Sequence, residues 1–250
     1  MVLEVNKIYC GDCLEVMKEI PDDSIDMILC DLPQGITQNK WDIALSFDLL
    51  WKQYERVAKD NAAIVLFGNQ PFSSQLVCSN LSLFKYEWIW EKDKATGHLN
   101  ANKRPMKSHE QILIFYKSLP VYNPQKYIGN PCHSRGLATG TIGKTTNYGK
   151  HIGVETTGNM KFPLSIIKFN KEWGLHPTQK PISLLEYFIN TYTDENALVL
   201  DNCIGSGATA VACINTKRNF IGIELSQEYC DIARKQIASS QILLTGHENK

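Results

Sequence analysis

Short apolar runs alternate with amphipathic segments along most of the chain. The apolar runs lie at residues 26–31, 62–68, 111–116, 197–201 and 220–224. Each has the near-continuous hydrophobicity of a strand that is buried on both faces of a parallel sheet. Between them, apolar residues recur at helical spacing, which predicts helices at residues 13–20, 47–59, 183–192, 208–216 and 227–241. We therefore predict an α/β fold with a mostly parallel sheet and helices on both faces.

Residues 120–174 break this alternation, because they are rich in Gly, Asn, Thr and Lys and show little periodicity. A segment of this length without clear elements is usually functional or inserted into a compact domain. We predict a first half at residues 1–119, an inserted region at 120–174 and a second half at 175–250. The two halves together would form one domain.

Charge is spread unevenly, although the net charge of the chain is +0. Residues 91–180 hold fourteen Lys and Arg against five Asp and Glu, so the rest of the chain is acidic. A basic middle is expected of a surface that binds phosphates, although lysine-rich loops are also common on soluble proteins.

Several features bound the setting in which the protein works. We find no run of about 18 apolar residues and no secretory signal, so we expect no membrane contact. Many of the 8 cysteines lie in apolar runs, as free thiols do in a reducing cytoplasm, where we place the protein. Cys10 and Cys13 form an isolated C-x-x-C, which we interpret as two small residues flanking a turn. No cluster has the spacing of metal ligands, and we expect no metal.

A glycine-rich turn at residues 201–209 follows an apolar run and precedes a predicted helix. Gly205 and Gly207 allow the backbone to turn tightly and to approach a ligand. Glu224 ends the next apolar run about twenty residues later, where a carboxylate can bind ribose hydroxyls. The pattern predicts a nucleoside cofactor, and the lack of a full G-x-G-x-x-G counts against a nicotinamide. A turn that binds nothing would show the same glycines.

Residues 31–35, with the sequence D-L-P-Q-G, end the first apolar run. The exocyclic amine of a base is a poor nucleophile, because its lone pair is delocalised into the ring. A carboxylate and a backbone carbonyl can accept hydrogen bonds from both N–H groups and draw the nitrogen toward a tetrahedral geometry. Asp31 and the carbonyl of Leu32 suit this task, and Pro33 fixes the backbone between them. An Asp that caps a Pro-Gly turn is the structural alternative.

Four stretches of the sequence resemble motifs of the β class of DNA amino-methyltransferases. Residues 31–33 resemble the start of the D-P-P-Y motif, and residues 201–209 resemble the D-x-F-x-G-S-G-T-T loop that binds AdoMet. Residues 176–181 resemble the H-x-T-Q-K-P segment, and residues 11–14 resemble G-D-x-L. The catalytic motif precedes the AdoMet loop, which is the permuted order of the β class. Residues 31–42 are similar to the small phage- or prophage-type members.

The resemblance implies an AdoMet-dependent methyltransferase fold of Rossmann-like type with an inserted target-recognition region. The implied cofactor residues are Asp12, Asp31, Lys180, Asp201, Cys203, Gly205, Gly207 and Glu224. The implied catalytic residues are Asp31, Leu32, Pro33 and Gln34. Asp201, Gly205 and Gly207 would surround the methionine part of AdoMet. Glu224 would hold its ribose, Asp12 would contact its adenine, and Lys180 would lie in the segment that closes over it.

The chain departs from the family pattern at two positions. Ala208 replaces the first Thr of the loop, which we expect to be mild. Gln34 replaces the aromatic residue that stacks on a flipped base in the family, and such stacking is worth about 1–3 kcal/mol. A slow enzyme, an altered target base and a knock-down all follow as interpretations; we expect retained AdoMet binding.

Flipping a base out of the duplex requires a basic channel and a group that fills the gap. We predict phosphate contacts from Lys94, Lys103, Arg104 and Lys107, which flank residues 96–100, and a DNA contact from His98 within that stretch. Lys40 and Trp41 follow the catalytic motif and would line the base pocket. Basic and aromatic residues of the inserted region would add further contacts.

The sequence predicts a site-specific methyltransferase that modifies N6 of adenine in double-stranded DNA. Methylation of cytosine N4 is the nearest alternative, although Asp31 favours adenine. Methylation of RNA or of a protein amine, and a DNA- or AdoMet-binding relic inactivated at Gln34, are further alternatives. A homodimer is possible, and whether a restriction endonuclease partner exists is not decided by the sequence.

Overall fold

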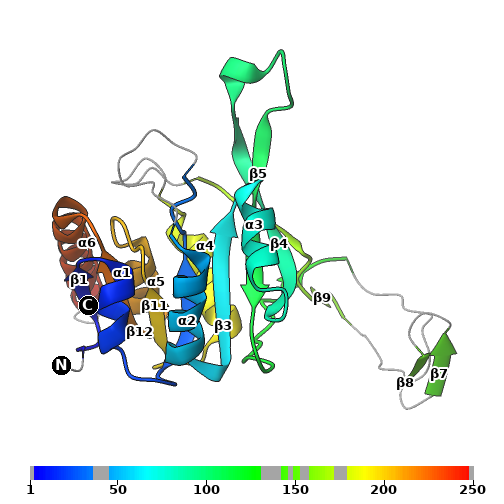
Figure 1. Ribbon diagram of the computed structural model, residues 1–250. Helices are drawn as coiled ribbons and strands as arrows, with labels where there is room; N and C mark the ends of the chain where they lie inside the picture. Colours follow the sequence, from blue (N-terminus) through cyan, green and yellow to red (C-terminus); the bar gives the residue numbers. More distant parts are fainter. Residues whose placement is uncertain are drawn as a thin grey trace. The chain divides into compact units, whose positions relative to one another are not determined.

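The computed structural model describes residues 3–35, 45–130, 142–145, 149–152, 158–171 and 179–247, and only the backbone of 142–145, 149–152 and 241–247. These residues divide into two units. The main unit consists of Met1–Asn123 and Ser165–Lys250, and the second unit is Pro124–Leu164. The first and last parts of the chain therefore share one unit (Figure 1).

An eight-stranded sheet forms the centre of the main unit. In spatial order its strands are β1 (Lys7–Cys10), β12 (Asn219–Glu224), β11 (Leu198–Asp201), β2 (Ile25–Cys30), β3 (Ala58–Gly68), β5 (Lys107–Phe115), β4 (Phe84–Thr96) and β10 (Ile166–Phe169). Only β5 is antiparallel to its neighbours, β3 and β4. The prediction of a mostly parallel sheet is confirmed. Because β5 is antiparallel, the expectation of a parallel strand at residues 111–116 was wrong.

Helices cover both faces of this sheet, as predicted. They are α1 (Cys13–Val16), α2 (Phe47–Val57), α3 (Phe72–Ser79), α4 (Ile182–Tyr192), α5 (Ala208–Asn215) and α6 (Gln227–His247). Alternate residues of a strand point to opposite faces. Met27 and Leu29 of β2 accordingly pack in one core with α4, α5 and α6. Ile28 and Cys30 pack in another core with α1, α2 and α3.

Strands β4 and β5 form a hairpin at one side of the sheet. Beyond the pair Glu91 and His109, their register shifts before Thr96 pairs with Lys107. The turn contains the short 3-10 helix η2 (His98–Asn100). Figure 1 shows this end of the hairpin standing away from the carboxyl edge of the sheet. The sequence patterns did not predict β4, because its mixture of charged and aromatic residues is not a continuous apolar run.

The second unit contains two small antiparallel pairs of strands. One joins β6 (Tyr127–Ile128) to β9 (Met160–Lys161), and the other joins β7 (Ile142–Thr145) to β8 (Gly149–Ile152). The unit lies within the predicted insertion at 120–174, whereas β10 belongs to the main sheet. In the described part of the chain, no helix has the length and apolar character needed to cross a membrane.

Candidate active site

Three carboxylates of the predicted site lie at the ends of adjacent parallel strands. Asp201 ends β11, Glu224 ends β12, and Asp31 directly follows β2. These strands are neighbours in the order β12, β11, β2, so their carboxyl ends meet at one edge of the sheet. Ligands of open α/β sheets bind at this edge.

Asp201 fixes the loop after β11 by accepting two hydrogen bonds from it. Its Oδ1 accepts a hydrogen bond from the backbone N–H of Cys203 at 3.1 Å, and its Oδ2 accepts one from the hydroxyl of Thr209 at 2.6 Å. The Tyr54 hydroxyl donates to Asn202 Oδ1 at 2.5 Å and ties the loop to α2. Burial raises the pKa of Asp201 to about 6, although the hydrogen bonds from Thr209 and Cys203 oppose the rise. Asp201 therefore acts as the support of the loop.

Two glycines shape the loop in different ways. Gly207 has a φ of 94°, and a Cβ added there would lie 2.9 Å from the Cβ of Ala233 on α6. Its lack of a side chain therefore allows α5 and α6 to pack. Gly205 has a φ of 54°, and a Cβ added there would meet nothing within 4 Å. The space beside Gly205 is open for a ligand.

Glu224 and Asp12 lie next to this loop and bind backbone N–H groups. Glu224 accepts from Gly205 N at 3.0 Å and from Ser226 N at 2.8 Å. Asp12 caps α1 by accepting from Leu14 N at 2.8 Å. Both carboxylates are thereby fixed at the carboxyl ends of β12 and β1, which are paired. Their contacts with ribose and adenine remain predictions.

Cys203 lies in the loop among other thiols. Hydrogen bonds with Cys13 and Cys30, together with burial, hold the pKa of the Cys203 thiol well above its usual range. Burial raises the pKa of Cys30 to about 12. The Cys203 and Cys30 thiols are therefore neutral at physiological pH, and they act as packing groups at the loop after β11 rather than as nucleophiles.

Asp31 presents its two carboxylate oxygens differently. Oδ2 is bound by the ammonium group of Lys180, whereas Oδ1 is buried and has no hydrogen-bond partner among the described residues. Leu32 is buried beside it, and the side-chain oxygen of Gln34 is a second buried acceptor that no described residue binds. The D-L-P-Q motif therefore holds two acceptors ready for a donor that enters the site.

Glu110 and Lys92, which were not predicted as catalytic residues, extend this cluster. Glu110 Oε2 lies 3.3 Å from Lys180 Nζ, and the other oxygen of Glu110 binds Lys92. Lys180 was predicted to lie in the segment that closes over the cofactor, and this stays a prediction; its ammonium group contacts Asp31 and Glu110. The sequence offered one indication of Glu110, a carboxylate immediately before a buried strand.

Burial and charge compete at these residues. Burial raises the pKa of Asp31, the charge of Lys180 opposes this rise, and the charge of Glu110 adds to it. For Glu110, the attraction of Lys180 and Lys92 outweighs burial and lowers the pKa to about 2. Burial would lower the pKa of Lys180, but Asp31 and Glu110 raise it. Glu110 and Lys180 are therefore charged at neutral pH.

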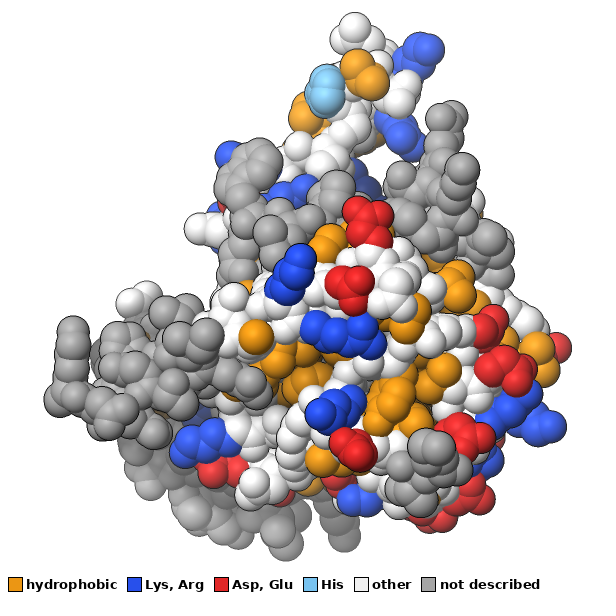
Figure 2. Space-filling model, turned by 90° about the vertical axis from the view of Figure 1, so that its left-hand side faces the viewer, with side chains coloured by type: hydrophobic (Ala, Val, Ile, Leu, Met, Phe, Trp, Pro, Cys, Tyr) orange, Lys and Arg blue, Asp and Glu red, His pale blue; other side chains and the backbone are white. Residues whose placement is uncertain are grey.

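The predicted DNA contacts fall on the β4–β5 hairpin. Lys94, His98, Lys103 and Arg104 are exposed, and Figure 2 shows basic side chains and a histidine gathered at the hairpin end. Lys107 differs from them, because its ammonium group binds Asn69 Oδ1 after β3. Lys40 and Trp41 lie outside the described residues.

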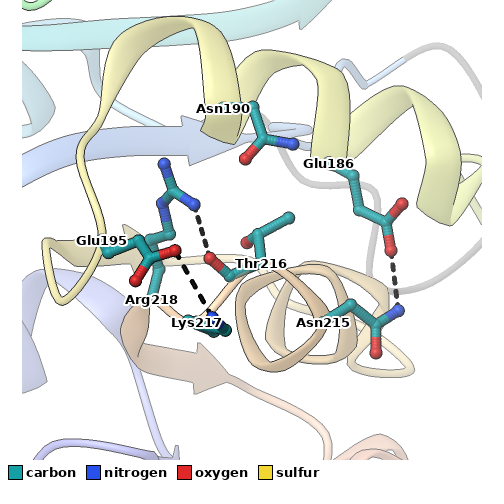
Figure 3. Close-up of a pocket in the computed structure, with 7 residues that line it drawn as sticks. All are labelled: Glu186, Asn190, Glu195, Asn215, Thr216, Lys217 and Arg218. Carbon is teal, nitrogen blue, oxygen red and sulfur yellow. Dashed lines mark hydrogen bonds and ion pairs between the residues drawn. The ribbon is translucent and has the colours of Figure 1, made fainter.

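A polar pocket of about 330 Å³ lies at the other edge of the sheet, where β12 begins (Figure 3). Most of its polar side chains are paired with one another or with the backbone. Lys217 contacts Glu195 at 3.6 Å, Asn215 donates to Glu186 at 2.7 Å, and Arg218 donates to Thr193 O at 2.8 Å. We do not assign a ligand to this pocket.

The sheet order and the loop after β11 define the class of AdoMet-dependent methyltransferases. Within this class, a family model described as DNA methylase matches residues 25–235. The chain belongs to this family, and it is an AdoMet-dependent DNA methyltransferase, as its motifs predicted.

Relatives with similar sequences span most of the chain. Type II methyltransferase M.BglII of Bacillus subtilis is 30% identical over 92% of this chain and 68% of its own length. DNA adenine methyltransferase YhdJ of Escherichia coli (strain K12) is 28% identical over 94% of this chain and 83% of its own. Among solved structures, the protein in the crystal structure of the M1.HpyAVI–SAM complex has 26% sequence identity to this chain. The two structures match with a TM-score of 0.64 over 92% of this chain and 98% of that one.

Proposed function

We propose that the chain methylates N6 of adenine in double-stranded DNA. The observation that carries this proposal is the free Oδ1 of Asp31, a buried acceptor beside the cofactor loop. A buried acceptor without a partner costs free energy, and a donor from the substrate would repay it. The exocyclic amine of adenine is such a donor.

The residues at the carboxyl edge fit AdoMet. The loop at Gly205 leaves open space, and a helix of eight residues begins directly after Gly207. Helix starts attract carboxylates, and a carboxylate terminates the methionine part of AdoMet. Glu224 and Asp12 are fixed on the adjacent strands β12 and β1, where a nucleoside would lie. Together these features support the predicted cofactor roles.

At the target base, the chain orients and polarises the amine. AdoMet, when bound, supplies an electrophilic methyl group. Oδ1 of Asp31 and the backbone carbonyl of Leu32 would accept the two N–H groups, which localises the lone pair on the nitrogen. After transfer, Oδ1 of Asp31 is the acceptor for the proton that the amine releases.

Gln34 would take the place of the aromatic residue of the related motif. Its side-chain oxygen is a buried acceptor without a partner, so it is available to a donor on the base edge. A hydrogen bond of this kind contributes about 0.5–1.5 kcal/mol, and stacking on an aromatic ring contributes about 1–3 kcal/mol. We therefore expect slower transfer than with an aromatic residue, but not inactivity.

The hairpin between β4 and β5 would bind the DNA backbone. Lys94, Lys103 and Arg104 are exposed on it, and Leu99 at its end is 87% exposed. Basic side chains attract phosphates, and an exposed apolar side chain at the tip can enter the stack from which a base has left. These features support base flipping by the hairpin.

Expression in a bacterial host without DNA methylation tests the proposal. Nucleosides of the host DNA are measured by mass spectrometry for the wild type, for Asp31→Ala and for the control Asp60→Ala, whose carboxylate is exposed and contacts Lys117. We expect N6-methyladenine from the wild type and the control only. N4-methylcytosine would transfer the assignment to cytosine, and unmodified DNA would refute the proposal. Light scattering on the purified chain distinguishes a monomer from a homodimer.

A further inference from the structure

Four charged side chains of alternating sign connect the β4–β5 hairpin to the catalytic carboxylate. Lys92 binds Glu110, Glu110 contacts Lys180, and Lys180 binds Asp31. The side chains of Lys92, Lys180 and Glu110 are 6%, 10% and 11% exposed. We call these four residues the ion-pair chain of the site.

The fold places Lys92 and Glu110 on one buried face of the hairpin. Glu110 pairs with Trp90 across the two strands, and Lys92 lies two residues after Trp90 on the same face. Trp90 packs in the core with α4, and Lys180 lies just before α4. The Lys180 ammonium also lies 5.1 Å from the centre of the Phe67 ring. Lys180 is therefore held from three sides.

Stability alone does not account for this arrangement. Burying ion pairs costs about as much desolvation free energy as their attraction returns, and apolar replacements are often equally stable. Within the ion-pair chain, Asp31 is the residue that would touch the proposed substrate, and no described residue donates a hydrogen bond to its Oδ1. Lys180 is shared between two carboxylates, so each limits how closely the other can bind it.

We propose that Glu110 and Lys92 are positioning residues for methyl transfer. Glu110 competes with Asp31 for Lys180, which keeps Lys180 on one oxygen of Asp31 and leaves the other for the amine. Lys92 neutralises part of Glu110 and thereby sets how strongly Glu110 pulls on Lys180. This inference rests on the proposed methylation of a base amine.

The two positioning residues should shift the ionisation of Asp31 in opposite directions. The charge of Glu110 raises the pKa of Asp31, and the charges of Lys180 and Lys92 lower it. Among the residues that the structure describes, Asp201 on β11 and Cys30 on β2 also interact with Asp31. Both stay unchanged in the variants below, so they do not confuse the comparison.

The test compares Glu110→Gln, Lys92→Met and Lys180→Met with the control Glu91→Gln. Glu91 is adjacent to Lys92 in sequence, but its ion pair with Lys168 is exposed. Asp31 is titrated by carboxyl carbon NMR, with its signal assigned from Asp31→Asn. Methyl transfer is measured in single turnovers with saturating duplex DNA and AdoMet.

We expect Glu110→Gln to lower the titration midpoint of Asp31 and Lys92→Met to raise it. Glu110→Gln should slow transfer by about tenfold, as expected when one hydrogen bond to a charged group is weakened, with an unchanged dissociation constant for AdoMet. On a Lys180→Met background, Glu110→Gln should change the rate by less than about twofold, because the effect passes through Lys180. The control should match the wild type throughout.

Shifts of the Asp31 midpoint in the same direction, or equal slowing with and without Lys180, would overturn the inference. If Glu110→Gln does not fold, Lys92→Met combined with Glu110→Gln removes one charge of each sign, and a buried pair removed together is tolerated. This double variant should still slow transfer, and a wild-type rate from it would also overturn the inference. A wild-type chain that methylates no DNA would refute the proposed function, and the inference with it.

Discussion

Replacing Gln34 should reveal a conflict between stability and activity at the base pocket. No described residue binds its buried side-chain oxygen, and a buried acceptor without a partner destabilises the protein before the substrate binds. Gln34→Leu removes this oxygen and keeps a similar volume. We therefore expect the Leu variant to be more stable and to transfer methyl groups more slowly.

The expected changes in Tm and in rate depend on whether the Gln34 side-chain oxygen has a hydrogen-bond partner. A buried acceptor without a partner costs about 1–3 kcal/mol, and a chain of this size gains roughly 2–4 °C in Tm for each kcal/mol. Loss of one hydrogen bond to the base would slow transfer by about two- to twelvefold. Gln34→Tyr loses this hydrogen bond but adds stacking worth about 1–3 kcal/mol, so it should accelerate transfer by roughly fivefold at the middle of both ranges.

Calorimetry measures the Tm, and single turnovers with labelled AdoMet and duplex DNA measure the rate. Gln75→Leu is the control, because Gln75 is exposed on α3, and its Tm and rate should remain near those of the wild type. A Gln34→Leu variant that is less stable than the wild type, or that transfers as fast, would refute the role of Gln34 as an acceptor for the base.

Four further substitutions probe the loop after β11 and the hairpin. Gly207→Ala should destabilise the protein by about 1–3 kcal/mol in urea unfolding, because its Cβ would collide with Ala233; Gly205→Ala, which meets open space, should mainly weaken AdoMet binding in calorimetry. Leu99→Ala should leave the Tm unchanged and slow transfer on paired DNA more than on DNA with a mismatched target, which is easier to flip. Burial raises the pKa of Asp201 to about 6, so the unfolded state binds fewer protons than the folded state between about pH 4 and pH 6. The free energy of unfolding therefore falls over this range, and Asp201→Asn should remove about 3 kcal/mol of that fall.

The sequence predicted the part of the fold that depends on local pattern. Buried strands and amphipathic helices alternate, and both faces of the sheet are covered as expected. The predicted helix at residues 47–59 ends at Val57, because Ala58 is extended and begins β3. The direction of β5 could not be predicted, because an apolar run has the same pattern in either direction. Strand β4 was missed because only part of one face is buried.

The candidate site was predictable where residues follow each other in motifs. Asp31, Asp201, Gly205 and Glu224 lie at one edge of the sheet because each ends or follows a parallel strand. Lys180 was identified by its motif, but its contact with Asp31, 149 residues away in sequence, depends on how α4 packs. Contacts of this kind are set by tertiary structure and leave no local pattern.

The antiparallel direction of β5 explains why Glu110 lies at the same edge of the sheet as Asp31. The amino end of β5 lies at the carboxyl edge of the sheet, because β5 is antiparallel to β3. Glu110, near the start of β5, therefore lies at the same edge as Asp31; in a parallel strand it would lie at the opposite one. The same reversal creates the hairpin with β4, whose outer end carries the exposed basic residues and whose base carries Lys92. The element proposed to bind DNA is thus also the element that carries Glu110 and Lys92, whose charges act on the proposed catalytic carboxylate of Asp31.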